Sequence, residues 1–169
     1  GPGPLTSPVS ALPVSVQGYP ITVGAGGVGA QGPRNNPPGG VLATNGGQSV
    51  FSTVTSAGGG FGGINSDPAP AQRAGGPGGS GGGSSWQTRT GGTGNTPPVS
   101  PAQGNDGGNG SSAPTYQGGP GGGAVGAGTD LPWPAGNDGA SGGAGAVSHI
   151  TGSPVGYAGG GGGGGTNNP

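Results

Sequence analysis

The chain has 169 residues, of which 52 are glycine and 20 are proline, and only 25% are hydrophobic. This composition excludes a thick apolar core and nearly excludes α-helix, because glycine and proline are the poorest helix formers. Three arginines, four aspartates and no lysine leave a net charge of −1. That balance argues against nucleic-acid binding and against attraction to anionic membranes. The absence of cysteine excludes disulfides and thiolate metal sites.

The chain divides by composition into three parts. Residues 1–12 are a proline-rich lead-in, 13–165 are expected to form a glycine-rich structural domain, and 166–169 are a short tail. The N-terminus has no charged segment followed by an apolar one, so no signal peptide is predicted. No apolar run reaches the length of a transmembrane helix, so membrane insertion is not expected.

Short strands are predicted near 12–23, 48–56 and 145–158. The first region begins with the alternating sequence LPVSVQ, and the second places Val50, Ser52 and Val54 on one face of a single strand. Glycine-rich turns flank that second strand. Three aromatic residues beside these apolar segments are expected to anchor packing, namely Tyr19, Phe51 and Phe61.

The sequence Gly24-x-Gly26-x-x-Gly29 has the spacing of a dinucleotide-binding loop and follows the apolar residues 21–23. Such a loop must open a helix whose N-terminus holds the pyrophosphate. In this sequence Pro33, Pro37 and Pro38 lie where that helix would be, and they exclude it. We therefore predict a glycine-rich loop after a strand, with no cofactor.

The remaining glycine runs favour the polyproline-II conformation, which has three residues per turn and no internal hydrogen bonds. Without Cβ atoms, neighbouring passes can approach and pair their amides and carbonyls laterally. A collagen triple helix is not expected, because no Gly-X-Y register is sustained. The predicted fold class is mostly irregular or all-β. It is a bundle of polyglycine-II-like passes with a few short β-strands and essentially no α-helix.

Few residues have catalytic or metal-binding potential. His149 is the only histidine and is expected to be a surface or turn residue. Asp106 and Asp138 each lie in a GNDG sequence, which is typical of a turn, with calcium ligation as the alternative interpretation. No catalytic residue, cofactor site or metal site is predicted, and the protein is not expected to be an enzyme.

Surface contacts are predicted at three aromatic residues and one asparagine. Trp86 and Trp133 lie in polar or proline-rich linkers, where an indole can stack on a sugar or anchor a protein contact, or instead cap a glycine face. Tyr116 is the third candidate. Asn109 begins the sequon Asn-Gly-Ser and is a candidate glycosylation site.

Several segments, in this order, resemble the glycine-rich domain of tailed-bacteriophage tail and tail-fibre proteins. They are YPITVGAGGVG, NGGQSVFSTVTSAGGG, GGPGGSGGGSS, GGTGNTPPVSPAQGNDGGNG, GGGAVGAG and ITGSPVGYAGGGGGGG. The likeness extends from about Pro13 to Gly165, and TDLPWPAG departs from it. In related phage adhesins, glycine-rich parts form packed polyglycine-II helices whose connecting loops touch the host receptor. The resemblance implies such a fold here and assigns no binding residue.

Together these observations predict a non-enzymatic structural or adhesive domain of a phage tail fibre or similar surface appendage. The expected location is a virion tail or the extracellular space. Self-association and contact with a host-surface glycan or protein are the expected partnerships. Two alternatives stay open: a self-assembling, glycosylated extracellular fibril subunit, and a polyproline-II ice-binding protein, which the irregular spacing of small residues disfavours.

Overall fold

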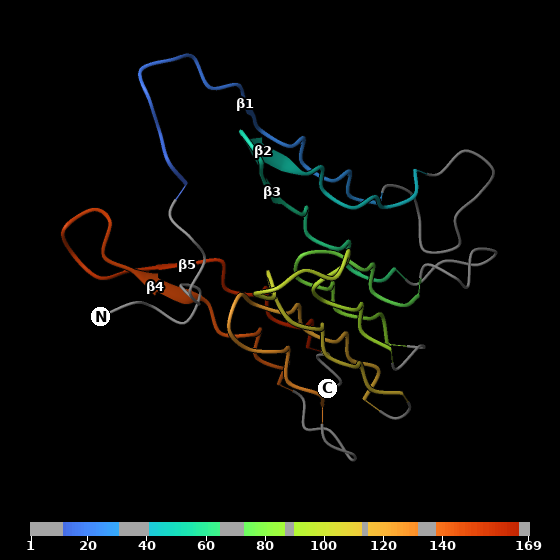
Figure 1. The fold of residues 1–169 in the computed structure, drawn as a ribbon. Coiled ribbons are helices and arrows are strands. Elements are labelled where there is room, and N and C mark those ends of the chain that lie inside the picture. Colours follow the sequence, from blue (N-terminus) through green and yellow to red (C-terminus); the bar gives the residue numbers. More distant parts are fainter. Residues whose placement is uncertain are drawn as a thin grey trace.

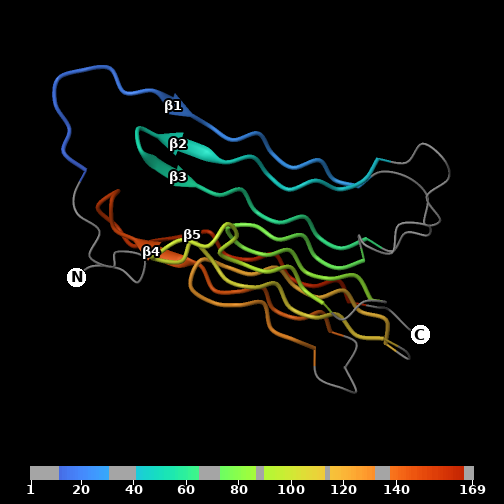
Figure 2. The same cartoon turned by 45° about the vertical axis from the view of Figure 1, so that its right-hand side comes forward.

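The computed structural model describes residues 12–30, 41–64, 73–86, 90–112, 115–131 and 138–165. None of these residues lies in a helix. Most of them run back and forth in extended passes that lie side by side, with the short strands gathered at one end (Figures 1 and 2). We name each pass by its residue range. This arrangement confirms the predicted fold class for the described part of the chain.

Neighbouring passes are joined by main-chain hydrogen bonds that recur at every third residue. In pass 115–124, the amides of Gly118, Gly121 and Ala124 donate to the carbonyls of Gly164, Gly161 and Ala158, at 3.2, 2.9 and 2.9 Å. A step of three residues returns to the same side of a polyproline-II helix. Because that helix has no internal hydrogen bonds, these lateral bonds provide the partners that its main chain needs.

Residues three positions apart form one row along a pass, so a pass has three rows. The other two rows of pass 115–124 face different neighbours. Gly119 and Gly122 donate to the carbonyls of Ser84 and Gly81, at 2.8 and 2.9 Å. The carbonyl of Pro120, in the third row, accepts from the amide of Gly108 at 2.7 Å. Pro120 is fully buried, and at its position the bond to pass 103–112 requires a carbonyl acceptor and no N–H donor. The missing N–H of proline therefore leaves no buried donor without a partner.

Glycine is required where two passes come close together. A Cβ atom built on Gly82 would lie 1.9 Å from the carbonyl oxygen of Phe61, and one built on Gly60 would lie 1.9 Å from that of Gly76. Non-bonded heavy atoms need roughly 3.5 Å. In contrast, a Cβ on Gly26 would meet no atom within 4 Å. The spacing between passes therefore depends on the absence of side chains at specific positions.

Five short strands form two antiparallel sheets (Figure 1). They are β1 (Ile21–Thr22), β2 (Ser49–Phe51), β3 (Val54–Ser56), β4 (Ala146–Ser148) and β5 (Val155–Tyr157). The first sheet has the order β1-β2-β3, with Ile21 opposite Phe51 and Phe51 opposite Val54. The second sheet is the hairpin β4-β5. Each strand continues into, or follows from, a glycine-rich pass, so the hairpins set where the passes begin.

Two strand predictions need correction. Residues 48–56 form the hairpin β2-β3 and not one strand, because the chain reverses at Ser52, whose φ is 53°. Residues 12–17 contain no strand. There the amide of Gln17 donates to the carbonyl of Ser15 at 2.9 Å, so a local turn replaces sheet pairing. Alternation of apolar residues thus indicated extended chain at 48–56 but not its reversal, and at 12–17 it predicted sheet pairing that does not form.

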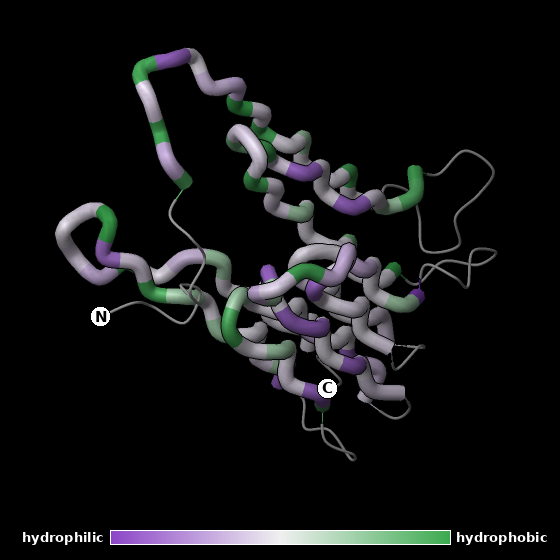
Figure 3. The backbone as a smooth tube through the Cα atoms, in the orientation of Figure 1, coloured by the Kyte–Doolittle hydropathy of each residue, from purple (hydrophilic) through white to green (hydrophobic). Residues whose placement is uncertain are grey.

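Apolar side chains do not form the interior of the bundle. The buried hydrophobic residues among those described are alanines, Ala43, Ala124, Ala140 and Ala146. Larger apolar residues are exposed, and many lie on the hairpins and the segments beside them (Figure 3). Tyr19 and Phe51 pack with ring centroids 5.7 Å apart. Within the described residues, no helix has the length and hydrophobicity that crossing a bilayer requires.

Replacing Gly82 with alanine tests whether close approach of the passes stabilises the fold. The new methyl group would collide with the carbonyl of Phe61, so Gly82→Ala should lower the free energy of unfolding by about 1–3 kcal/mol. Gly26→Ala, in open space, should raise it by about 0.4–1 kcal/mol through the unfolded chain. Thermal and denaturant unfolding followed by circular dichroism measures both, and equal effects would contradict the packing described.

Candidate functional site: an aromatic pair at the ends of the central passes

Two passes, 79–86 and 115–124, occupy the middle of the bundle, and we call them the central passes. Pass 79–86 exchanges main-chain hydrogen bonds with passes 57–64, 73–78, 90–95, 103–112 and 115–124. Residues 81–85 are all buried. The central passes are therefore held on most sides, and residues at their ends have well-defined positions.

Trp86 and Tyr116 lie together at the end of the bundle away from the strands. The amide of Gly63 donates to the carbonyl of Gly83 at 2.7 Å, so pass 79–86 ends beside the end of pass 57–64 that is remote from β3. The ring centroids of Trp86 and Tyr116 are 4.8 Å apart with an interplanar angle of 74°. This edge-to-face geometry is a favourable aromatic arrangement.

The chain around Tyr116 is fixed by a tight set of hydrogen bonds. The amide of Ser111 donates to the carbonyl of Gln117, and the amide of Gln117 donates to the hydroxyl of Ser111, both at 2.9 Å. Gln117 is fully buried, and its Nε2 donates to the carbonyl of Asp138 at 3.1 Å. Tyr116 has a φ of 46° and is 47% exposed, whereas Trp86 is half-buried. The phenol is thus presented outward on a held turn.

Asn109 uses its side chain within the bundle. Its Oδ1 accepts from the amide of Gly91 at 2.9 Å, and its Nδ2 donates to Oδ2 of Asp130 at 3.1 Å. The main-chain amide of Asn109 also donates to Asp130, at 2.8 Å. A glycan would be attached at this same Nδ2 atom. Glycosylation of Asn109 stays a prediction, and it would compete with the bond to Asp130.

The other sequence candidates have structural roles in the described chain. Oδ1 of Asp106 accepts from the amide of Gly94 at 2.7 Å. His149 is exposed in the turn between β4 and β5, as predicted, and its carbonyl accepts from Gly152. Residues 24–29 belong to a pass, where the carbonyl of Ala25 accepts from Gly47. Among the described residues, no group of three or more acidic or histidine side chains could hold a metal ion.

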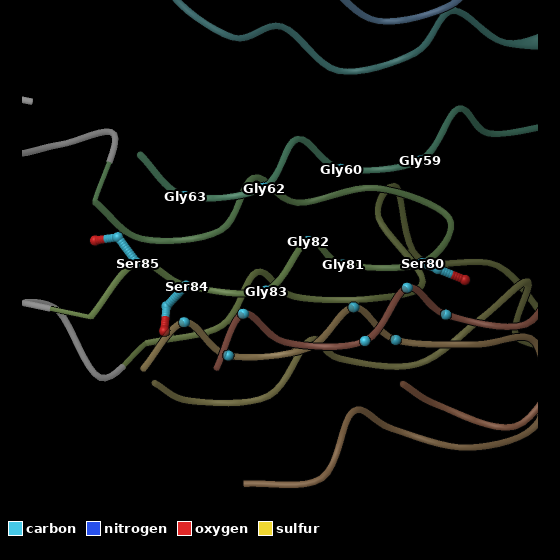
Figure 4. Close-up of a pocket in the computed structure, with 18 of the residues that line it drawn as sticks. Gly59, Gly60, Gly62, Gly63, Ser80, Gly81, Gly82, Gly83, Ser84 and Ser85 are labelled. Carbon is cyan, nitrogen blue, oxygen red and sulfur yellow. The ribbon is translucent and has the colours of Figure 1, made fainter. Parts of the chain in front are cut away.

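A groove of about 560 Å³ runs along the central passes and is lined almost entirely by glycine (Figure 4). Passes 57–64 and 158–165 form its two walls, and Trp86 also lines it. Ser85, only 5% exposed, is also among the lining residues, and its buried hydroxyl bonds to no other described residue. No sequence motif indicates this groove, because passes distant in sequence form it.

The whole sequence, residues 1–169, matches a family model described as a glycine-rich domain. The chain belongs to this glycine-rich domain family. No curated protein and no solved structure matches it. Membership of the glycine-rich domain family agrees with the fold described above.

The structure therefore brings together two of the three predicted aromatic contacts. Trp86 and Tyr116 are 30 positions apart in the sequence, yet they meet because their passes are neighbours. Trp133 lies outside the described residues. The spacing of the glycine runs predicted that passes exist, but nothing in it indicated which pass ends would be adjacent.

A double-mutant cycle tests the contact between the two rings. Trp86→Ala and Tyr116→Ala should each destabilise the protein, and the pair should show a coupling free energy of about 0.5–1.5 kcal/mol, because each single change already removes the contact. The matched control pairs Trp86→Ala with Tyr157→Ala in β5, where additive effects are expected. Unfolding curves provide the four free energies, and additivity in the first cycle would contradict the geometry.

Proposed function

We propose that this member of the glycine-rich domain family is a non-enzymatic structural and adhesive domain of a phage tail fibre or a similar surface appendage. It would act on a virion tail or outside the cell. The observation that carries the proposal is the placement of the Trp86–Tyr116 pair at one end of a bundle held by main-chain hydrogen bonds. The likeness of the sequence to phage tail and tail-fibre domains supports the same context.

A bundle of this kind suits an adhesive role for a physical reason. Its internal stability comes from main-chain bonds, so side chains in its turns are free to serve recognition. A tryptophan and a tyrosine with large faces and polar tips suit contact with a sugar ring or a protein surface. The half-exposed phenol of Tyr116 beside the indole of Trp86 offers both features in one place.

Binding of fluorescently labelled protein to glycan arrays and to a panel of intact bacterial cells tests the adhesive role. Trp86→Ala and Tyr116→Ala should each weaken binding by about tenfold, the loss expected for an aromatic hot spot. Tyr157→Ala, at the opposite end of the bundle, is the matched control and should bind normally. Absence of binding to every surface, or equal loss in the control, would contradict the proposal.

A second candidate, a self-assembling fibril subunit, is favoured by the exposed apolar residues of the two hairpins. Ile21 and Val54 of the first sheet are 70% and 54% exposed, and Ile150 in the β4-β5 turn is 88% exposed. Both sheets are small and have open edges, and exposed edges are templates for pairing with another chain. Burial of this apolar end against other copies would remove it from water.

Self-association can be measured by sedimentation equilibrium. Ile21→Ser and Ile150→Ser should each weaken association by about tenfold, because each loses roughly 1.5 kcal/mol or more of apolar burial. Val28→Ser, at a 47% exposed valine six residues beyond β1, is the control and should associate like the unmodified chain. A chain that stays monomeric at high concentration would exclude the fibril candidate and leave the adhesive one in place.

A further inference from the structure

The directions of the main-chain groups around each pass define where a neighbour can bind. A polyproline-II helix has three rows of residues, and each row carries one line of amides and one line of carbonyls. A pass can therefore bond to as many as six neighbours, with donor and acceptor lines alternating around it. A line that has no partner marks an open position beside the pass.

Pass 79–86 uses five of these six lines. Its carbonyls accept from passes 57–64, 90–95 and 115–124, and its amides donate to passes 73–78 and 103–112 and, at Gly79 alone, to the carbonyl of Gly58. The remaining line contains the amide of Gly83, which donates to no described residue. Gly83 is buried and lines the groove. By elimination, this amide line is directed at the groove, between passes 57–64 and 115–124.

Pass 115–124 also leaves one line open on the same side. Its amides donate to passes 79–86 and 158–165 and, through Gly123, to Gly126, while its carbonyls accept from passes 103–112 and 138–145. The carbonyls of Gly119 and Gly122 accept from no described residue, although Gly122 is buried. Both residues line the groove. The floor of the groove thus presents a donor line beside an acceptor line.

The two walls extend this alternation. On pass 57–64, the amides of Gly60 and Gly63 donate to pass 79–86, and their carbonyls have no described partner. On pass 158–165, the carbonyls of Gly161 and Gly164 accept from pass 115–124, while the amides of the same two residues, which lie beside that pass, have no described partner. From one wall across the floor to the other wall, the open lines are therefore carbonyls, amides, carbonyls and amides. One more polyproline-II pass in the groove could bond to all four, because its own amide and carbonyl lines alternate in the same way.

We propose that the groove binds one further polyproline-II segment, five or six residues long and rich in glycine, from a partner polypeptide. The wall formed by residues 159–164 spans six residues, or about 19 Å at 3.1 Å per residue. A Cβ on Gly62 or on Gly161 would meet nothing within 4 Å, so no described residue fills the space beside either wall. The bound segment would complete the ring of neighbours around both central passes.

The same surface selects against other occupants. The described residues that line the groove carry no charged side chain, so it has no means of pairing with an ionic ligand. Its hydrogen-bonding groups belong to the main chain, and their repeat of three residues matches polyproline II and not a β-strand, which repeats every two residues. The occupant needs small residues because a branched side chain would hold its amides away from the floor.

A peptide with the sequence Gly-Gly-Pro-Gly-Gly-Gly and a fluorescent label is the probe, since proline favours the polyproline-II conformation. Anisotropy should show saturable binding to the unmodified protein, and the same peptide with alternate glycines changed to valine should not bind. Gly62→Leu and Gly161→Leu place a side chain in the groove from its two walls. Each should weaken binding by about tenfold or more, whereas Gly26→Leu, in open space elsewhere, should leave it unchanged.

An NMR measurement on the unmodified chain makes the test independent of these variants. Peptide binding should shift the amide resonance of Gly83 and slow its hydrogen exchange. Absence of saturable binding, shifts that spare Gly83, or binding unchanged in both leucine variants would overturn the proposal. If unlabelled protein itself competes with the peptide and the leucine variants lose self-association, the occupant is a second copy of this chain, which would overturn the assignment to a separate partner.

Discussion

Amides and carbonyls that point sideways from a polyproline-II pass must each find a partner in a neighbouring pass, and this requirement governs the whole structure. The bonds repeat every third residue, as between Gly118 and Gly164 and again between Gly121 and Gly161. They can form only where no side chain separates the passes, as at Gly82 against Phe61. A protein with only alanines as buried hydrophobic residues in its described part is thus ordered by its main chain.

This way of ordering the interior changes what the side chains are available to do. In a protein with an apolar core, large hydrophobic and aromatic residues are mostly committed to packing. Here many of them lie at the two ends of the passes: the aliphatic residues of the hairpins at one end, and Trp86 with Tyr116 at the other. The two proposed functions draw on these opposite ends, so assembly through one end is compatible with adhesion through the other.

The groove arises from the same rule that holds the passes together. Where a neighbour is missing, the rule leaves unsatisfied lines of donors and acceptors, and a buried amide such as that of Gly83 is costly to leave without a partner. Among the described residues, the open position beside the central passes therefore favours an occupant in the conformation that would fill it. Recognition by main-chain complementarity would be tolerant of sequence but selective for small residues and for polyproline-II geometry.

The sequence by itself determined the absence of helix in the described residues, the lack of an apolar core and the use of glycine passes with short strands, because composition limits what a chain can bury. It also identified Trp86 and Tyr116 singly. It did not determine the reversal at Ser52, the meeting of the two rings or the groove. Those depend on which passes become neighbours, and glycine runs of nearly identical sequence carry no information about pairing. Only the three-dimensional arrangement of main-chain bonds decides it.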